Sequence, residues 1–525
     1  MSSAAESASS YPEFVFFGRS ELSDFFFLAA LALLAFVFYL APWAPLYISA
    51  FAAVAVLTWL RLDLSLALVV LFAPFFMLPK HFGSREFYPS EVFILLDVVV
   101  AALWFAHANW RKRLDLSRLL RSPFVAPAAL LLIAGGISTV LAADRHDALR
   151  AYREVLLEPA AFFALLVLVE RRLSLWRLLF VSLITTGVIV AAVGIYQFAT
   201  GHGLSVTPGT SLKRIPSVYG SADNVGLLFD RVLPVWLAGF TIYLLARWSE
   251  AGRIVRSTAE TAADRVTRVL RTLPADLGLP GGVALLVGAL LFIALVLTYS
   301  RGAWVAVALA ALFLLVLLFR WGRWLALACF VVALFALAVK GPSIARTLNS
   351  GHAGTTHQRI NVWHSALTML KHKPIFGIGP DNFLHYYAPT RKENRWQREC
   401  APGLGYIQPD AGSEPCLSHP HNEFLDFWLS TGILGLIAFI WLEIVFWQIC
   451  LRSWRANLPA KALTLGAMSA MFAALIHGLV DNSYFLPDLS IIFWLLCGFA
   501  AFVYASQSSR HPQGAHDSAR DGLAR

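Results

Sequence analysis

Long apolar stretches recur along the chain and are separated by short polar segments. Because the hydrocarbon core of a bilayer takes about 20 apolar residues as a helix, each stretch predicts a membrane span. About fourteen spans (a range of 12 to 14) are expected, near residues 22–41, 43–60, 64–79, 91–107, 123–141, 154–170, 174–199, 224–246, 281–299, 303–319, 324–340, 424–450, 460–480 and 486–505. The second and third stretches are short and the third contains Pro74, so a re-entrant pair is the alternative there.

The composition supports a membrane protein. Of 525 residues, 58% are hydrophobic and 14% are charged, and there are five cysteines. Soluble domains have about 45–50% apolar and about 25% charged residues, and single cores stop growing beyond about 250–300 residues. Sparse charge and few cysteines exclude disorder, a coiled coil and a secreted disulfide scaffold. The sequence therefore predicts an all-α polytopic membrane protein.

The cations in the short loops predict the orientation. If the N-terminus is cytoplasmic, the inside short loops hold 20 Lys and Arg residues and the outside short loops hold eight. The long loop 341–423 is left out, because long segments cross the membrane regardless of charge. This bias predicts that both termini are cytoplasmic and that the long loop is external. The net charge of +10 is explained by this topology, and nothing in it indicates nucleic acid.

The domain organisation follows from the spans. The polar N-terminus lacks the basic region of a signal peptide, so the first span is expected to stay attached. Basic and apolar residues alternate with helical spacing in the cytoplasmic loop, which predicts an amphipathic helix on the inner leaflet. The expected parts are an N-terminal tail (1–21), N-terminal spans (22–246), this amphipathic loop (247–280), central spans (281–340), the large external loop (341–423), which is periplasmic or extracellular, C-terminal spans (424–505) and a cytoplasmic tail (506–525).

Several cations lie on the predicted outer face, where the charge rule does not favour them. Arg301 sits in a short link between two apolar spans and is followed by Gly302, which permits a tight turn. Lys213 and Arg214 precede another external turn and could be interfacial cations or ligands of an anion. Arg231 lies inside a span beside Asp230, and either an ion pair or a buried anion contact would explain it.

The long loop contains a predicted helix. Apolar residues recur at helical spacing from Thr356 to Lys371, and Pro374 ends the pattern. Arg359 and His364 lie in its N-terminal half. The following GIGP lacks the Lys-Ser/Thr and the strand–helix context of a phosphate loop, so it predicts a turn.

A polar cluster precedes the next span in the stretch SHPHNEFLD. His419 and His421 with at most one carboxylate are too few ligands for a metal site, so no metal and no cofactor are expected. A histidine oriented by a carboxylate or an amide is a natural general base, with an N-cap cluster as the alternative. Asn422 is a candidate orienting group. In a later external turn, Asp481 could be a cap or an orienting carboxylate.

Two cysteines, Cys400 and Cys416, lie in the external loop. A disulfide between them is expected in an oxidising compartment, and two free thiols are the alternative.

External arginines and one base suggest a substrate. Arginine binds phosphate oxygens bidentately, so a basic pocket at the membrane surface favours an anionic, phosphorylated lipid. A diphosphate is already a good leaving group, and arginines can neutralise its charge without a divalent metal. The base then has only to activate an acceptor hydroxyl.

The stretches SRGAW, KPIFGIGPDNF and HPHNEFLDFWLSTGILGL, with an Asp in the last external turn, resemble the O-antigen ligase and O-antigen polymerase superfamily over about residues 210–500. The resemblance implies a GT-C-like membrane glycosyltransferase in the bacterial inner membrane with a periplasmic active site. It implies a glycan on undecaprenyl diphosphate as donor and transfer with inversion. It further implies that His421 is the base, that Arg301 and Arg359, with Arg214 and Lys213 as weaker partners, bind the diphosphate, and that Asp481 orients the base.

Three acceptors remain open: a lipid A-core sugar, which is expected most, another lipid-linked glycan, or a protein side chain. The stretch 389–418 is longer than the family needs and could shape acceptor choice. A transporter or flippase is the alternative from another class, because Asp97 and Glu158 lie within predicted spans. Their meeting in a central cavity would favour transport, whereas convergence of Arg301, Arg359 and His421 at the interface would favour transfer.

Overall fold

The computed structural model describes residues 19–82, 85–169, 172–206, 211–256, 278–332, 334–335, 355–390, 419–455 and 460–508. The expected Cys400–Cys416 disulfide and most of the loops 247–280 and 389–418 lie outside the described residues.

The N-terminal half is a series of helices with two short hairpins. The α-helices are α1 (Arg19–Leu40), α2 (Ala44–Leu60), α3 (Leu62–Phe72), α4 (Pro89–Ala106), α5 (Ala108–Arg111), α6 (Leu116–Leu120), α7 (Val125–Val140), α8 (Arg145–Ala151), α9 (Glu158–Val169) and α10 (Leu173–Thr200). A 3-10 helix, η1 (Ala73–Met77), follows α3, and a π-helix, η2 (Tyr152–Leu157), precedes α9. Strands β1 (Lys80–Phe82) and β2 (Arg85–Phe87) form one antiparallel hairpin, and β3 (Ser205–Val206) pairs with β4 (Lys213–Arg214) in another.

The C-terminal half holds the longest helices. They are α11 (Ala222–Arg256), α13 (Gly278–Thr298), α14 (Arg301–Leu318), α16 (Thr355–His372), α17 (Phe383–Thr390), α19 (Glu423–Arg455), α20 (Lys461–Gly478) and α21 (Pro487–Ser508). Helix α16 confirms the helix predicted in the long loop. The GIGP sequence forms the predicted turn, with Gly377 and Gly379 at φ values of 70° and 99°.

Among the described residues, nine helices are long and apolar enough to cross a membrane. Four shorter apolar helices lie at Ala44–Leu60, Leu62–Met77, Val125–Val140 and Gly322–Val332. The class of all-α polytopic membrane protein is thus confirmed, while the count of about fourteen spans stays a prediction. The stretch expected as one span at 154–170 is divided between η2 and α9.

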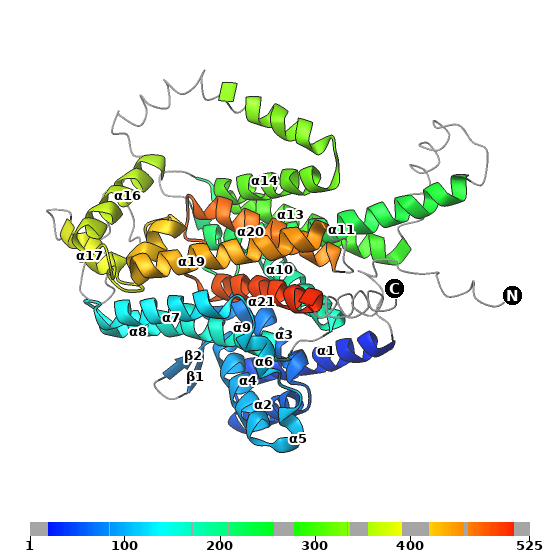
Figure 1. The fold of residues 1–525 in the computed structure, drawn as a ribbon, viewed down its shortest axis with the longest axis horizontal. Helices are drawn as coiled ribbons and strands as arrows, with labels where there is room; N and C mark the ends of the chain where they lie inside the picture. The colour runs from blue at the N-terminus through cyan, green and yellow to red at the C-terminus, as the bar shows by residue number, and fades with distance from the viewer. Residues whose placement is uncertain are drawn as a thin grey trace, which may run out of the picture.

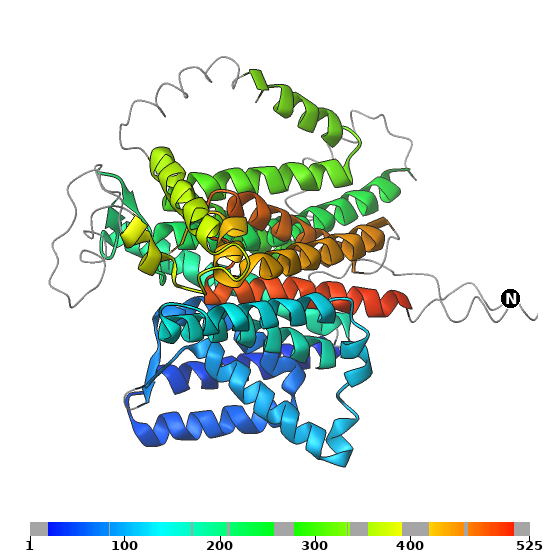
Figure 2. The same ribbon diagram turned by 60° about the vertical axis from the view of Figure 1, so that its left-hand side comes forward.

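The helices pack around a core rich in aromatic residues, and their outer faces are apolar. Trp104, Trp176 and Trp494 are fully buried, whereas Phe26 and Leu33 are 63% and 65% exposed. Exposed apolar side chains of this size are stable where the solvent is lipid, which is as apolar as leucine. Figures 1 and 2 show the blue N-terminal helices on one side of the bundle, followed by cyan helices and then by the red and orange C-terminal helices.

One end of the bundle gathers the polar connections. We call it the site end, where α7 and α20 end and where α14, α19 and α21 begin. Helices α16 and α17, in yellow, lie at this end in Figure 1. Here the Ser138 hydroxyl donates to the Phe376 carbonyl at 2.6 Å, which ties α7 to the segment after α16. At the opposite end, Arg61 binds Asp63 at 2.8 Å.

Helix α19 is broken near its start. Gly432 has φ 72° and ψ −179°, a conformation outside the helical region. The backbone groups that the break frees find partners in the loop after α16: Ile378 N donates to Leu429 O at 2.6 Å, and Ile433 N donates to Ile375 O at 3.0 Å. The first turns of α19, which begin at the last residue of the HPHNE sequence, are therefore positioned by this loop.

Candidate active site

A histidine–carboxylate pair forms the centre of the site end. His421 lies just before α19, and Asp481 lies in the turn between α20 and α21. His421 Nδ1 is 2.6 Å from Asp481 Oδ1. The His421 side chain is 26% exposed and that of Asp481 is 6% exposed. The pair therefore offers an accessible imidazole whose other nitrogen, Nε2, is left for a substrate.

Helix α16 adds a cation to this pair. Arg359 Nη2 is 3.3 Å from Asp481 Oδ2, the oxygen that His421 does not use. One turn further along, Trp363 Nε1 donates to the backbone carbonyl of His421 at 3.3 Å. The long-loop helix thus contacts both members of the pair, and it brings Arg359 to the carboxylate that His421 contacts.

The charges around Asp481 keep it ionised. Burial raises the pKa of Asp481, but His421, His477 and Arg359 together hold the pKa well below its ordinary value. A carboxylate at this position fixes the tautomer of His421 with the proton on Nδ1. The unprotonated Nε2 can then accept a proton.

Asn422 connects the two segments that carry the pair. Its side-chain oxygen accepts from Leu425 N at 3.0 Å, which caps α19. Its side-chain nitrogen donates to Leu479 O, just after α20, at 2.9 Å. Asn422 therefore links the segment that carries His421 to the segment that carries Asp481.

Arg301 begins α14 at the same end. Its side chain is exposed and, among the described residues, has no ion pair or hydrogen bond. The next residue, Gly302, lies so close to His477 that a Cβ placed on it would collide with the imidazole ring. His477 Nε2 in turn is 3.9 Å from Asp481 Oδ2. The exposed Arg301 guanidinium therefore belongs to the residue next to Gly302, and Gly302 packs against the histidine beside Asp481.

Arg214 and Lys213, the two weaker candidates for diphosphate binding, lie in and beside other contacts than Arg301 and Arg359 do. Arg214 binds Asp223 Oδ1 at 2.5 Å and donates through Nε to Thr298 O at 2.6 Å. It is thereby engaged within the protein, where it joins β4 to the end of α13. Lys213 is exposed on the short β3–β4 hairpin. Neither is brought to the His421–Asp481 pair by a contact of the described residues.

Three buried residues behind the pair complete the network. Arg231 lies in α11, and its Nη1 is 2.6 Å from Asp230 Oδ1. Of the two explanations that the sequence allowed for Arg231, the structure thus shows the ion pair. Asp230 Oδ2 is 2.6 Å from Nδ1 of His477. His477 was not predicted from the sequence, although its spacing of four residues from Asp481 near a helix end was a usable signal.

A second histidine lies beside the first. His419 Nδ1 is 2.8 Å from Asp426 Oδ2, and the hydroxyl of Ser430 donates to Asp426 Oδ1 at 3.0 Å. Burial lowers the pKa of His419, but Asp426 and the nearby Asp381 reverse this effect, and the net result is a raised pKa. Within the described ranges, no three His, Cys, Asp or Glu side chains are grouped to hold a metal ion.

The two carboxylates that suggested transport have separate partners. Asp97 accepts a hydrogen bond from the Ser65 hydroxyl at 2.7 Å inside the bundle. Glu158 lies 3.4 Å from Arg153, which also binds Glu91 at 2.7 Å near the start of α4. No contact among the described residues joins Asp97 to Glu158, whereas His421 and Arg359 share one carboxylate.

The fold and this cluster define a polytopic membrane protein with a histidine–carboxylate–arginine site at one end. Residues 286–440 match the family model described as O-antigen ligase. This segment is therefore similar to the O-antigen ligase family, which supports the resemblance of the sequence to the O-antigen ligase and polymerase superfamily. No curated protein matches the chain. The matched segment contains Arg301, Arg359 and His421, whereas Asp481 lies beyond it.

Proposed function

We propose that the protein is an inverting glycosyltransferase that moves a glycan from undecaprenyl diphosphate to an acceptor hydroxyl at the periplasmic face of the bacterial inner membrane, with both termini cytoplasmic. The observation that carries this proposal is the convergence of His421 and Arg359 on Asp481, next to the start of α14. The match of residues 286–440 to the O-antigen ligase family supports a lipid-linked glycan as donor and a membrane-associated acceptor.

His421 acts as the general base in this proposal. Its Nε2 takes the proton of the acceptor hydroxyl while the acceptor oxygen attacks the anomeric carbon of the donor sugar. The bond from that carbon to the diphosphate oxygen breaks, and its electron pair leaves with undecaprenyl diphosphate. Attack from the face opposite to the leaving group inverts the anomeric centre. The imidazolium that forms is stabilised by Asp481 at 2.6 Å.

Arg301 and Arg359 neutralise the charge that develops on the leaving diphosphate. Arg301 is exposed and free to bind phosphate oxygens. Arg359 uses Nη2 on Asp481, and its half-exposed guanidinium leaves its other nitrogens for a phosphate oxygen. Preorganised cations at a leaving group stabilise the transition state without a metal ion. Arg214 and Lys213 are weaker candidates for contact with the diphosphate. The Arg214 guanidinium is already bound to Asp223.

The acceptor we propose is a sugar of the lipid A-core, which makes the enzyme an O-antigen ligase. Polymerisation of lipid-linked glycans and transfer to a protein hydroxyl use the same chemistry and differ only in the acceptor. The test is product analysis after the purified protein in vesicles is mixed with one defined undecaprenyl-diphosphate glycan. Transfer that requires added lipid A-core supports the ligase, a ladder without it identifies a polymerase, and no product under either condition contradicts glycan transfer.

A further inference from the structure

His477 occupies a buried position between two aspartates. It lies in the last turn of α20, and its side chain is 1% exposed. Nδ1 is 2.6 Å from Asp230 Oδ2, and Nε2 is 3.9 Å from Asp481 Oδ2. Asp481 is therefore approached on three sides, by His421, by Arg359 and by His477. Of these three, His477 is the one that has no access to solvent.

Helix α11 anchors His477 from behind. Asp230 is fully buried and shares its second oxygen with Arg231. The Arg231 guanidinium also donates to the Ser483 hydroxyl at 2.6 Å and to the Ser483 backbone carbonyl. Ser483 lies in the same turn as Asp481, so α11 holds this turn through its Asp230–Arg231 pair. A buried charge network of this kind has a defined geometry only while every member is paired.

The ring of His477 also supports the start of α14. Gly302 lies against the ring with no room for a Cβ. A bulkier residue at position 302 or a shifted ring at position 477 would therefore move the first turn of α14. Arg301 belongs to that turn, so its position depends on the imidazole.

We propose that His477, held by Asp230, is a positioning residue for the transfer reaction. It fixes Asp481 from the side opposite to the substrate and sets the distance between Arg301 and the His421–Asp481 pair. This inference rests on the proposed function of His421 and Arg301. The charged groups around His477 are Asp230 from α11, which also binds Arg231, Asp481 from the turn, which also contacts His421 and Arg359, and Glu423, which reaches Gly478 from α19.

The test compares the kinetics and the pH profile of purified variants in vesicles. His477→Ala is expected to lower kcat by about 10- to 100-fold, as removal of a supporting partner commonly does. It is also expected to shift the acidic limb of the kcat–pH profile, because His421 loses its fixed carboxylate. His477→Gln keeps a polar side chain of similar length between Asp230 and Asp481 and should recover part of kcat. Ser469→Ala, a buried change on the same helix, is the control and should leave the profile unchanged.

A double variant tests the contact with α14. Gly302→Ala alone should reduce activity because its Cβ meets the His477 ring, whereas Gly302→Ala with His477→Ala should be no worse than His477→Ala alone. Additive losses, or an unchanged kcat–pH profile in every folded His477 variant, would overturn the positioning role. If the unaltered protein transfers no glycan, the proposed function itself fails, which is a distinct result.

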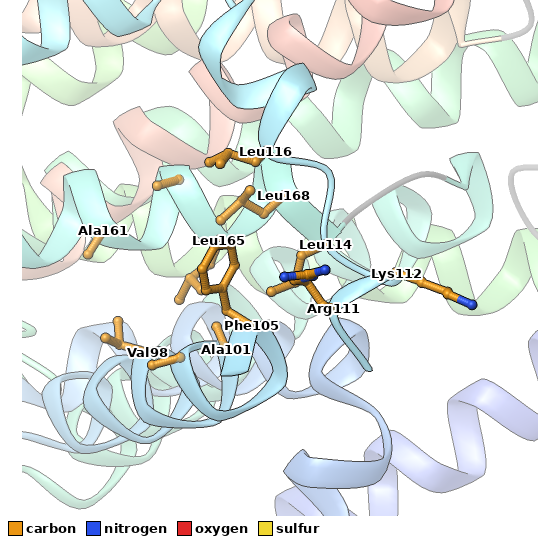
Figure 3. Close-up of a pocket in the computed structure, with 12 residues that line it drawn as sticks. Val98, Ala101, Phe105, Arg111, Lys112, Leu114, Leu116, Ala161, Leu165 and Leu168 are labelled. Carbon is orange, nitrogen blue, oxygen red and sulfur yellow. The ribbon is translucent and has the colours of Figure 1, made fainter. Parts of the chain in front are cut away.

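A cavity at the opposite end supports a second inference. It has a volume of about 670 Å³ and lies between α4, the α5–α6 segment and α9. Its walls are apolar, and Arg111 and Lys112 lie at its rim; Lys112 extends away from the apolar side chains (Figure 3). The lining residues are Val98, Ala101, Ala102, Phe105, Arg111, Lys112, Leu114, Leu116, Ala161, Ala164, Leu165 and Leu168.

The geometry points to an anionic phospholipid in this cavity. An acyl chain matches the apolar walls, and the exposed Arg111 and Lys112 match a phosphate in the headgroup layer. The acyl chains of neutral and anionic lipids would pack equally well against the apolar walls. Arg111 and Lys112 therefore determine the preference for an anionic headgroup. This inference does not depend on the proposed function.

The test measures lipid retention by native mass spectrometry, with phosphatidylglycerol and phosphatidylcholine supplied in equal amounts. Phosphatidylglycerol should be retained preferentially, and the preference should fall roughly fivefold for each of Arg111→Gln and Lys112→Gln. Ala164→Phe should reduce retention of both lipids by filling the cavity, and Arg320→Gln, an exposed cation elsewhere, should change neither. Equal retention of the two lipids, or an unchanged preference in the double Gln variant, would overturn the assignment.

Discussion

His421 Nδ1 and Asp481 Oδ1 lie 2.6 Å apart although the two residues are separated by 60 positions in the sequence. The pair brings the end of the long loop to the turn between α20 and α21. Because the carboxylate occupies Nδ1, the imidazole presents Nε2 to the accessible side.

Asp481→Asn should preserve the size of the side chain and remove its charge. The amide can stabilise neither the imidazolium nor the required tautomer of His421. We expect kcat to fall about 100-fold or more, within the range attributed to a general base, and KM for the acceptor to change little. Steady-state kinetics in vesicles measure this, and a variant that loses only acceptor affinity would contradict the orienting role.

Arg301→Lys keeps the charge and loses the planar, two-pronged contact with phosphate. Hydrogen bonds to charged groups contribute about 1.5–3 kcal/mol, so kcat/KM for the donor should fall about 10- to 100-fold. Arg214→Lys is the matched comparison, because Arg214 is bound to Asp223, and it should lose less turnover than Arg301→Lys. The reverse order of effects would assign the diphosphate contact to Arg214.

The sequence predicted the helices far better than the contacts between them. Hydropathy predicts where a span lies, since every span must satisfy its backbone internally. It does not predict that Arg214 faces Asp223 or that His421 faces Asp481, because those pairings depend on how turns from distant segments meet. His477 was missed because a lone histidine at the end of an apolar helix resembles an interfacial residue until Asp230 is seen beside it.

The break in α19 was missed for a related reason. In STGILGL, Gly432 is a small residue in an apolar run, and nothing local distinguishes a kink from close helix packing. The kink becomes evident only when Ile375 and Ile378 from the long loop supply the hydrogen bonds that the helix lacks.

Gly432→Ala should destabilise the protein and reduce activity. The native φ of 72° is unfavourable for any residue with a Cβ, at a cost of about 1–3 kcal/mol, and the added methyl would also meet the Ile375 carbonyl. A thermal unfolding scan in detergent should show a lower Tm. Gly282→Ala, where a Cβ meets no atom within 4 Å, should leave Tm near that of the unaltered protein; equal effects would refute a special requirement at 432.

The raised pKa of His419 predicts that the protein loses stability in alkaline solution. Its folded-state pKa is raised above the ordinary value, so the protonated form is favoured by folding. The stabilisation is fully present below about pH 6.5, the ordinary histidine value, and is lost as the pH rises through the folded-state pKa. Tm measured from pH 6 to 9 should fall, and the fall should be smaller in His419→Asn. The same slope in both proteins would rule out His419 as the source.

The most direct test of the account is glycan transfer by His421→Ala in vesicles that contain the lipid-diphosphate donor and lipid A-core. Matched Tm values of the variant and the unaltered protein should establish that both are folded. We expect the variant to bind donor and to form no detectable product, because no other group replaces Nε2 as the proton acceptor. Turnover near that of the unaltered protein would contradict the assignment of His421 as the base.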